Sequence, residues 1–97
     1  MNPIRLLRIA QIELDEAIAY YETELSNLGA EFLAEFLNAT SRIQIFPEAW
    51  PPFSRNTRRC LLRRFPYGII YIQDATDIVI IAVAHLHREP GYWQDRL

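Results

Sequence analysis

Residues 82–96, AVAHLHREPGYWQDR, concentrate side chains that can carry chemistry. An apolar run ends in His85 and His87, and Arg88, Tyr92 and Trp93 follow within a few positions. Histidine can transfer protons near neutral pH, arginine can hold phosphate or carboxylate, and aromatic rings can stack on a base. The segment is therefore an active site, a surface for a partner, or a polar end to the last strand.

The residue types argue against a metal, a disulfide or a nucleotide cofactor. His85 and His87 would share one face of a strand, but a zinc site needs a third ligand, which Glu89 or Asp95 would have to fold back to supply. Cys60 is the only cysteine, and its place in a strand indicates a packed thiol. The chain has three glycines and no glycine-rich phosphate loop, so we expect no cofactor.

Acid–base cleavage of RNA fits the residues better than a serine or cysteine hydrolase, because no serine or cysteine has a nucleophile-like setting. Such cleavage needs a group that titrates near neutral pH and cations that stabilise the phosphorane charge. The candidate groups are His85 and His87 for the proton and Arg63, Arg64 and Arg88 for the phosphate. In the alternative interpretation, Arg88 pairs with an acid while Tyr92 and Trp93 pack the tail onto the sheet.

Length, composition and charge restrict the class of protein. We expect a single domain over residues 1–97, with 51% apolar residues to fill its core. The longest apolar stretch, Ile78 to Ala84, is far shorter than the roughly 20 residues of a membrane span, and we expect a cytoplasmic protein. Residues 1–53 carry three arginines against eight acids, and residues 54–97 carry seven against four. The basic half can face RNA or an acidic partner.

Periodicity predicts a short strand and then two helices. Residues 4–9 form the strand, and from about Ala10 the apolar spacing becomes helical. The first apolar stripe comprises Leu14, Ala17, Ile18, Tyr21 and Leu25. Ser26 and Asn27 can cap a second helix from Leu28, which Pro47 ends. Its stripe comprises Phe32, Leu33, Phe36, Leu37, Thr40 and Ile43. So short a join predicts an antiparallel helical hairpin.

The second half predicts a small antiparallel sheet. Residues 47–57 hold three prolines and form a loop that Trp50 and Phe53 pin to the body. Strands are expected at 58–65, 67–73 and 78–85, with a polar turn at Asp74–Asp77. With the N-terminal strand at an edge, the fold class is α+β, a helical hairpin packed on an antiparallel sheet.

The strand at 78–85 is apolar on both faces, which predicts burial on both. Simple alternation places four residues on one face, Ile78, Ile80, Ala82 and Ala84, and four on the other, Val79, Ile81, Val83 and His85. The helical hairpin can cover only one face. The loop at 47–57, the C-terminal tail or another protein must cover the second.

These segments, in this order, resemble the RelE/ParE family of bacterial toxins, long labelled plasmid-stabilisation proteins. The resemblance is carried by ELDEAIAYYE and LGAEFLAEF in the helices, FPYGIIY in a strand, and the closing AVAHLHREPGYWQDR. It covers nearly the whole chain and implies a toxin of a type II toxin–antitoxin module. It also implies a cognate antitoxin, encoded nearby, that neutralises the toxin by wrapping it. An uncovered apolar face can also drive self-association, so the alternatives for the assembly are a homodimer and a toxin–antitoxin heterotetramer.

The family divides by target. RelE-like members cleave mRNA in the ribosomal A site without metal, and Arg63 and Tyr92 resemble residues of that branch. Leu86, however, stands where that branch keeps another arginine, and this chain has no lysine for the branch's basic positions. FPYGIIY and HLHREPGYW are closer to ParE-like members, and ParE acts on DNA gyrase. We therefore expect a ParE-like toxin that inhibits gyrase.

The resemblance implies surfaces for the target rather than a catalytic centre. The candidate contacts are Arg58, Arg59, Arg63, Arg64, Arg88, Tyr92 and Trp93. If the chain is instead a ribosome-dependent nuclease, its catalytic set would be Arg63, His87, Arg88 and Tyr92. A third alternative is a member that binds an antitoxin without being toxic.

Overall fold

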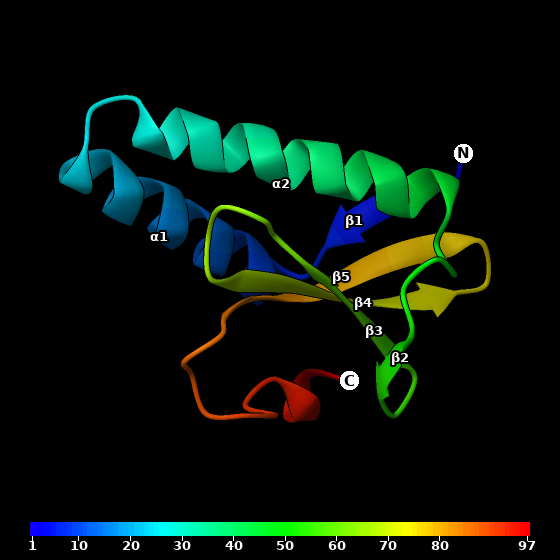
Figure 1. Cartoon of the computed structure of the whole chain (residues 1–97). Helices are drawn as coiled ribbons and strands as arrows, with labels where there is room; N and C mark the ends of the chain where they lie inside the picture. Colours follow the sequence, from blue (N-terminus) through cyan, green and yellow to red (C-terminus); the bar gives the residue numbers. More distant parts are fainter.

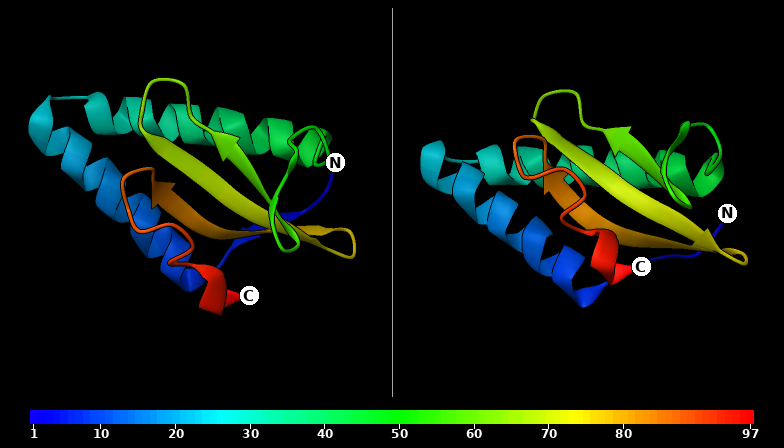
Figure 2. Two further views of the ribbon diagram at one scale, coloured as in Figure 1. Left: turned by 60° about the horizontal axis from the view of Figure 1, so that its bottom comes forward. Right: turned by 90° about the horizontal axis from the view of Figure 1, so that it is seen from below.

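The computed structural model describes residues 1–97 and has three layers. Helices α1 (Arg8–Glu24) and α2 (Leu28–Ile45) form an antiparallel hairpin on one face of the sheet, and the C-terminal segment crosses the other (Figure 1). The two turned views show the short helix η1 (Gln94–Arg96) near the start of α1 (Figure 2). Neither long helix has the length and apolar character that a membrane crossing requires. The α+β class is confirmed.

The sheet has five strands in the order β1-β5-β4-β3-β2. Their bounds are β1 (Ile4–Leu6), β2 (Pro52–Ser54), β3 (Thr57–Leu61), β4 (Tyr67–Asp74) and β5 (Asp77–His85). The meander of β3, β4 and β5 is confirmed, although β3 ends earlier than predicted. The loop expected at 47–57 contains the short strand β2. This strand was not predicted because it begins with proline, which has no backbone N–H to donate to a neighbouring strand.

The N-terminal strand lies at an edge, as predicted, but its direction is not that of an all-antiparallel sheet. β1 pairs in parallel with β5, Ile4 opposite Ile78 and Leu6 opposite Ile80. It also ends three residues early, because α1 begins at Arg8. Two helices separate β1 from the other strands, so no hairpin turn imposes an antiparallel direction, and the sheet is mixed.

β5 is buried on both faces, but its side chains change faces part-way along. Ile70 of β4 pairs with Ala82 and Tyr71 pairs with Ile80, which leaves Ile81 as an extra residue. Such a bulge shifts the alternation by one position. The helix-facing core contains Ile78, Ile80 and Val83, and the opposite core contains Val79, Ile81, Ala82 and Ala84. The expected faces of the four residues after the bulge were therefore wrong, and His85 lies with Tyr67 on the helix side.

Glu22 closes the turn between the helices, where Ser26 and Asn27 were expected to cap α2. Asn27 has a left-handed backbone, with φ of 76°, and its side chain makes no cap hydrogen bond. The Glu22 carboxylate instead accepts the N–H groups of Asn27 at 2.9 Å and Gly29 at 3.0 Å. A carboxylate suits this position because the first N–H groups of a helix lack partners and carry partial positive charge.

Replacing Glu22 by alanine is expected to lower the free energy of unfolding by about 1 kcal/mol, the usual loss when a helix cap is removed. Urea denaturation followed by circular dichroism measures this change. Asp15→Ala is the matched control, because it removes an exposed carboxylate far from the start of α2. If both variants lose the same stability, Glu22 does not act as a cap.

The larger core lies between the helices and the sheet, and aromatic rings fill its end near the helical turn. Phe32 is fully buried, with the rings of Phe65 and Tyr67 centred 4.9 Å and 5.0 Å away. Leu25 and Leu37, which their stripes placed on buried faces, are 62% and 53% exposed. Leu25 follows the last residue of α1 and has an extended backbone, so it does not continue the apolar stripe of the helix.

Candidate functional site

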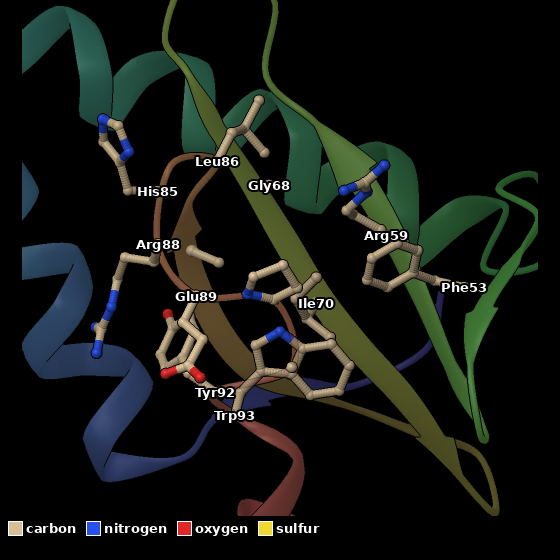
Figure 3. Close-up of a pocket in the computed structure, with 13 residues that line it drawn as sticks. Phe53, Arg59, Gly68, Ile70, His85, Leu86, Arg88, Glu89, Tyr92 and Trp93 are labelled. Carbon is tan, nitrogen blue, oxygen red and sulfur yellow. The ribbon is translucent and has the colours of Figure 1, made fainter.

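The C-terminal segment, residues 86–97, covers the second face of the sheet. Trp93 is 3% exposed and belongs to a small core with Ile70 and Ala82. Phe53 of β2 reaches the same place, its ring centred 6.0 Å from that of Trp93 (Figure 3). The face that the helices leave open is therefore covered by the chain itself.

Glu13 of α1 holds this segment in place. Its buried carboxylate accepts hydrogen bonds from the Tyr92 hydroxyl at 2.7 Å and from both terminal nitrogens of Arg96 at 2.9 Å. Arg88 lies farther away, at 3.4 Å. We call Glu13, Arg88, Tyr92 and Arg96 the C-terminal clasp. The clasp joins Glu13 of α1 to residues that lie more than 70 positions later in the chain.

The clasp lies where β5 lacks a neighbouring strand. β1 accompanies β5 only as far as Ile80. Beyond that point, the Val83 N–H donates to Glu13 at 3.0 Å and the Ile81 carbonyl accepts from Arg96 at 3.1 Å. Buried backbone groups require hydrogen-bond partners. The two side chains therefore take the place of a missing strand beside the bulge.

The Tyr92 hydroxyl is a hydrogen-bond donor within the clasp. Burial raises the pKa of its hydroxyl far above the usual range, and the hydrogen bond to Glu13 raises the pKa further. The guanidinium of Arg88 lies 3.7 Å from the centre of the ring. A phenol with a raised pKa that already donates to a carboxylate is a poor base at neutral pH. Arg88 thus lies beside Glu13, and Tyr92 packs against the core on the second face of the sheet, as in the alternative interpretation of the sequence.

Arg58 and Arg59 of β3 lie on opposite faces of the sheet, and only Arg59 lines the pocket that the C-terminal segment forms with the sheet. Neighbouring residues of a strand point to opposite faces. Arg58 donates to the carbonyl of Trp50, at the start of the proline-rich loop. Arg59 lies over the Phe53 ring, 4.1 Å from its centre. Each guanidinium is thus held beside an aromatic residue, on its own side of the sheet.

Arg63 and Arg64 lie in the turn between β3 and β4, beside α2. Arg64 pairs with Glu31 at 2.6 Å. The backbone N–H of Arg63 donates to Glu35, and the exposed Arg63 side chain makes no ion pair. The turn is therefore fixed by two acids of α2, while Arg63 keeps a free positive charge.

His85 and Cys60 occupy structural positions, whereas the His87 side chain is exposed. The Nδ1 atom of His85 accepts the backbone N–H of His87 at 3.0 Å. No three side chains among His, Cys, Asp and Glu lie close enough to share a metal ion, so neither Glu89 nor Asp95 completes a site with the histidines. Cys60 is 1% exposed, and burial raises the pKa of its thiol, which keeps it protonated and unreactive.

A pocket of about 100 Å³ lies between the segment and the sheet. Figure 3 shows Trp93 and Ile70 at its centre, Arg59 and Phe53 on one side, and Arg88 on the side of α1. Sites for drug-sized ligands usually enclose roughly 300 Å³ or more. This pocket is too small for such a ligand, so the segment presents a surface rather than a substrate cavity.

The model of the family described as ParE toxin of type II toxin-antitoxin system, parDE, matches residues 4–90. The chain belongs to this family. The resemblance to RelE/ParE toxins, and to the ParE branch in particular, is thereby confirmed. Tyr92, Trp93 and Arg96 of this toxin follow the matched range, so their placement rests on the structure.

A solved structure has the same fold as this toxin. It is a chain of the chromosomal ParDE toxin–antitoxin system from P. aeruginosa, with a TM-score of 0.65 and 15% sequence identity. The similarity covers 90% of this toxin and 98% of that chain. No curated protein matches the sequence.

Sequence reasoning missed two members of the toxin's clasp, Glu13 and Arg96. Glu13 is not in the predicted apolar stripe of α1, yet it lies three residues after Ala10 and four before Ala17, both buried. That spacing was the one local sign that an acid points inward. Arg96 gave no comparable sign, because its partner is distant in sequence.

Proposed function

We propose that this ParE family toxin inhibits DNA gyrase in the cytoplasm and that a cognate antitoxin neutralises it. The match to the ParE toxin family over residues 4–90 carries the proposal. The fold shared with a chain of a ParDE system supports it. Inhibition of this kind requires a surface that binds the target and no catalytic centre.

The clasp favours inhibition by binding over RNA cleavage. A RelE-like reaction would need Arg63, His87, Arg88 and Tyr92 to be free for RNA. The Tyr92 hydroxyl donates to Glu13, so the phenol of this set holds the C-terminal segment instead.

The segment and β3 are the proposed contact surfaces, with two kinds of residue. Trp93 is buried, and together with Tyr92 it positions the backbone of the segment. The charged groups that can meet a target include Arg58, Arg59, Arg63 and Arg64 near β3 and Arg88 in the segment, whose side chain is 54% exposed. Such charges suit an acidic surface and steer its approach.

The antitoxin is the second proposed partner. The sheet's second face is already covered by the toxin's own tail, so an antitoxin is not needed to complete that core. Light scattering on the free toxin and on the co-expressed pair would distinguish a monomer, a homodimer and a heterotetramer.

Expression of the toxin without its antitoxin tests the proposed function. We expect growth arrest with induction of the DNA-damage response and intact mRNA, and inhibition of supercoiling by purified gyrase. Rapid arrest of translation with cuts in A-site mRNA would replace gyrase by the ribosome as the target. Normal growth, with an antitoxin still bound, would identify a non-toxic family member.

Arg63→Gln is expected to weaken gyrase binding about tenfold, the loss of one charge-assisted contact of roughly 1.4 kcal/mol. The fold should be unaffected because the exposed side chain makes no ion pair. Surface plasmon resonance on immobilised gyrase measures the effect. Arg5→Gln is the control, because Arg5 is an exposed arginine of β1 whose ion pair with the exposed Asp74 is long, at 4.0 Å. A loss of the same size in both variants would point to net charge rather than to this turn.

A further inference from the structure

A groove lined by tyrosines lies where the second half of α1 meets the ends of β4 and β5. It measures about 560 Å³ and is lined by Tyr20, Tyr21, Glu24, Leu28, Pro66, Tyr67 and His85. A second hollow shares Tyr20, Tyr67 and His85 with it and extends along α1 to Glu16 and Glu13. The two form one continuous groove, which none of the proposed target contacts occupies except Arg88 at its far end.

Neighbouring aromatic rings that line the groove lie at steep angles to one another. Tyr20 and Tyr21 are 5.1 Å apart at 77°, and Tyr21 and Tyr67 are 6.1 Å apart at 67°. His85 continues the row, 5.0 Å from Tyr67 at 78°. Tyr20 is 55% exposed, so the groove is open to a partner. Aromatic faces carry negative potential and attract cations.

Two carboxylates of α1, Glu16 and Glu24, line this groove, and both are exposed. The ion pairs of the chain use Glu13, Glu31 and Asp74, so Glu16 and Glu24 have no cation of their own. Negative rings and free acids together disfavour phosphates and favour a positive side chain.

The clasp shows how this chemistry holds a guanidinium in the same molecule. Arg88 lies 3.7 Å over the Tyr92 ring while it contacts the Glu13 carboxylate. The groove repeats these elements, a tyrosine face beside a glutamate, but has no arginine from the chain itself except at its Glu13 end. A planar guanidinium stacks on a ring and pairs with a carboxylate better than a rounded ammonium does.

We propose that this groove binds an arginine side chain presented by a partner protein. Its guanidinium stacks against Tyr20 and Tyr67 and pairs with Glu24 or Glu16. Leu28 and Pro66, at the groove's end, contact the aliphatic stem. The binding site is separate from the proposed target contacts on β3 and does not depend on gyrase inhibition.

N-acetyl-arginine amide is the probe, titrated into the full chain while tyrosine ring resonances are followed by NMR. We expect millimolar binding that shifts the rings of Tyr20, Tyr21 and Tyr67. N-acetyl-citrulline amide has nearly the same shape without the charge and should leave these signals in place. Equal shifts from both compounds, or no shift from either, would overturn the proposal. Equal binding of N-acetyl-lysine amide would overturn the preference for arginine.

Variants of two exposed residues separate the ring from the charge. Tyr20→Leu should weaken binding about two- to fivefold, and Tyr20→Phe, which keeps the aromatic face, should preserve it. Glu24→Gln should weaken binding about two- to threefold, whereas Asp15→Asn, an exposed acid of α1 that does not line the groove, should not. Unchanged affinity in Tyr20→Leu, with folding verified by circular dichroism, would contradict the site whatever the outcome of the gyrase assays.

Discussion

Replacing Glu13 by alanine is expected to lower the free energy of unfolding by about 3 kcal/mol, because removing one partner of a buried ion pair leaves the other charge uncompensated. Arg96 is only 14% exposed at the side chain, so water cannot readily replace the lost carboxylate. The Val83 N–H and the Tyr92 hydroxyl lose the same acceptor. Urea denaturation followed by tryptophan fluorescence measures the change.

Two controls show whether the loss comes from the clasp. Asp15→Ala removes an exposed acid of the same helix and should cost less than about 0.5 kcal/mol. In a double-mutant cycle, Glu13→Ala and Arg96→Met should show a coupling energy of roughly 1–3 kcal/mol because the residues are in direct contact. Strictly additive losses would mean that the pair does not hold the segment to α1.

Trp93→Ala is expected to cost about 3–5 kcal/mol, the range found when a buried tryptophan is truncated. The ring contributes to the core that includes Ile70 and Ala82, and its loss also removes the neighbour of Phe53. Residues 86–97 should then exchange amide protons faster than the helical hairpin does, because the clasp becomes their main remaining attachment. Hydrogen exchange read by mass spectrometry, with chemical denaturation, tests both effects.

Trp93→Phe is the matched variant, because it keeps an aromatic ring in the same place and should lose about 1–2 kcal/mol at most. If Trp93→Ala is as stable as the parent chain, the second face of the sheet does not need the tail. If it is destabilised but its tail exchanges no faster, the clasp alone fixes the segment. Because Trp93 and Glu13 hold the same segment, the two losses should not simply add.

Regular elements were predictable because their patterns are local. The 3.6-residue spacing of α1 and α2, and the β-branched residues of β4 and β5, are visible within a dozen residues. Burial of β5 on both faces followed from its composition. The errors occurred where a distant element sets the geometry. They are the parallel direction of β1, the cap from Glu22, the edge strand β2 and the bulge at Ile81.

The candidate site was predicted only in part. The residues of segment 86–97 were recognised from their chemistry, and fastening by Arg88, Tyr92 and Trp93 was one of the interpretations considered. Which acid receives them could not be inferred, because residues 1–53 contain eight acids and most of them are solvated. The bulge also changed which side chains of β5 face the tail, and a single extra residue leaves no mark on the pattern.

The linear order of apolar, polar and turn-forming residues was sufficient for the two helices, the meander and the ParE family, since each depends on neighbours along the chain. The clasp and the tyrosine groove required the folded chain. Glu13 and Arg96 are 83 positions apart, and Tyr20 and Tyr67 come from a helix and a strand. Contacts at such separations are set by how α1 packs beside the open edge of β5, where backbone groups without a neighbouring strand had to find side-chain partners.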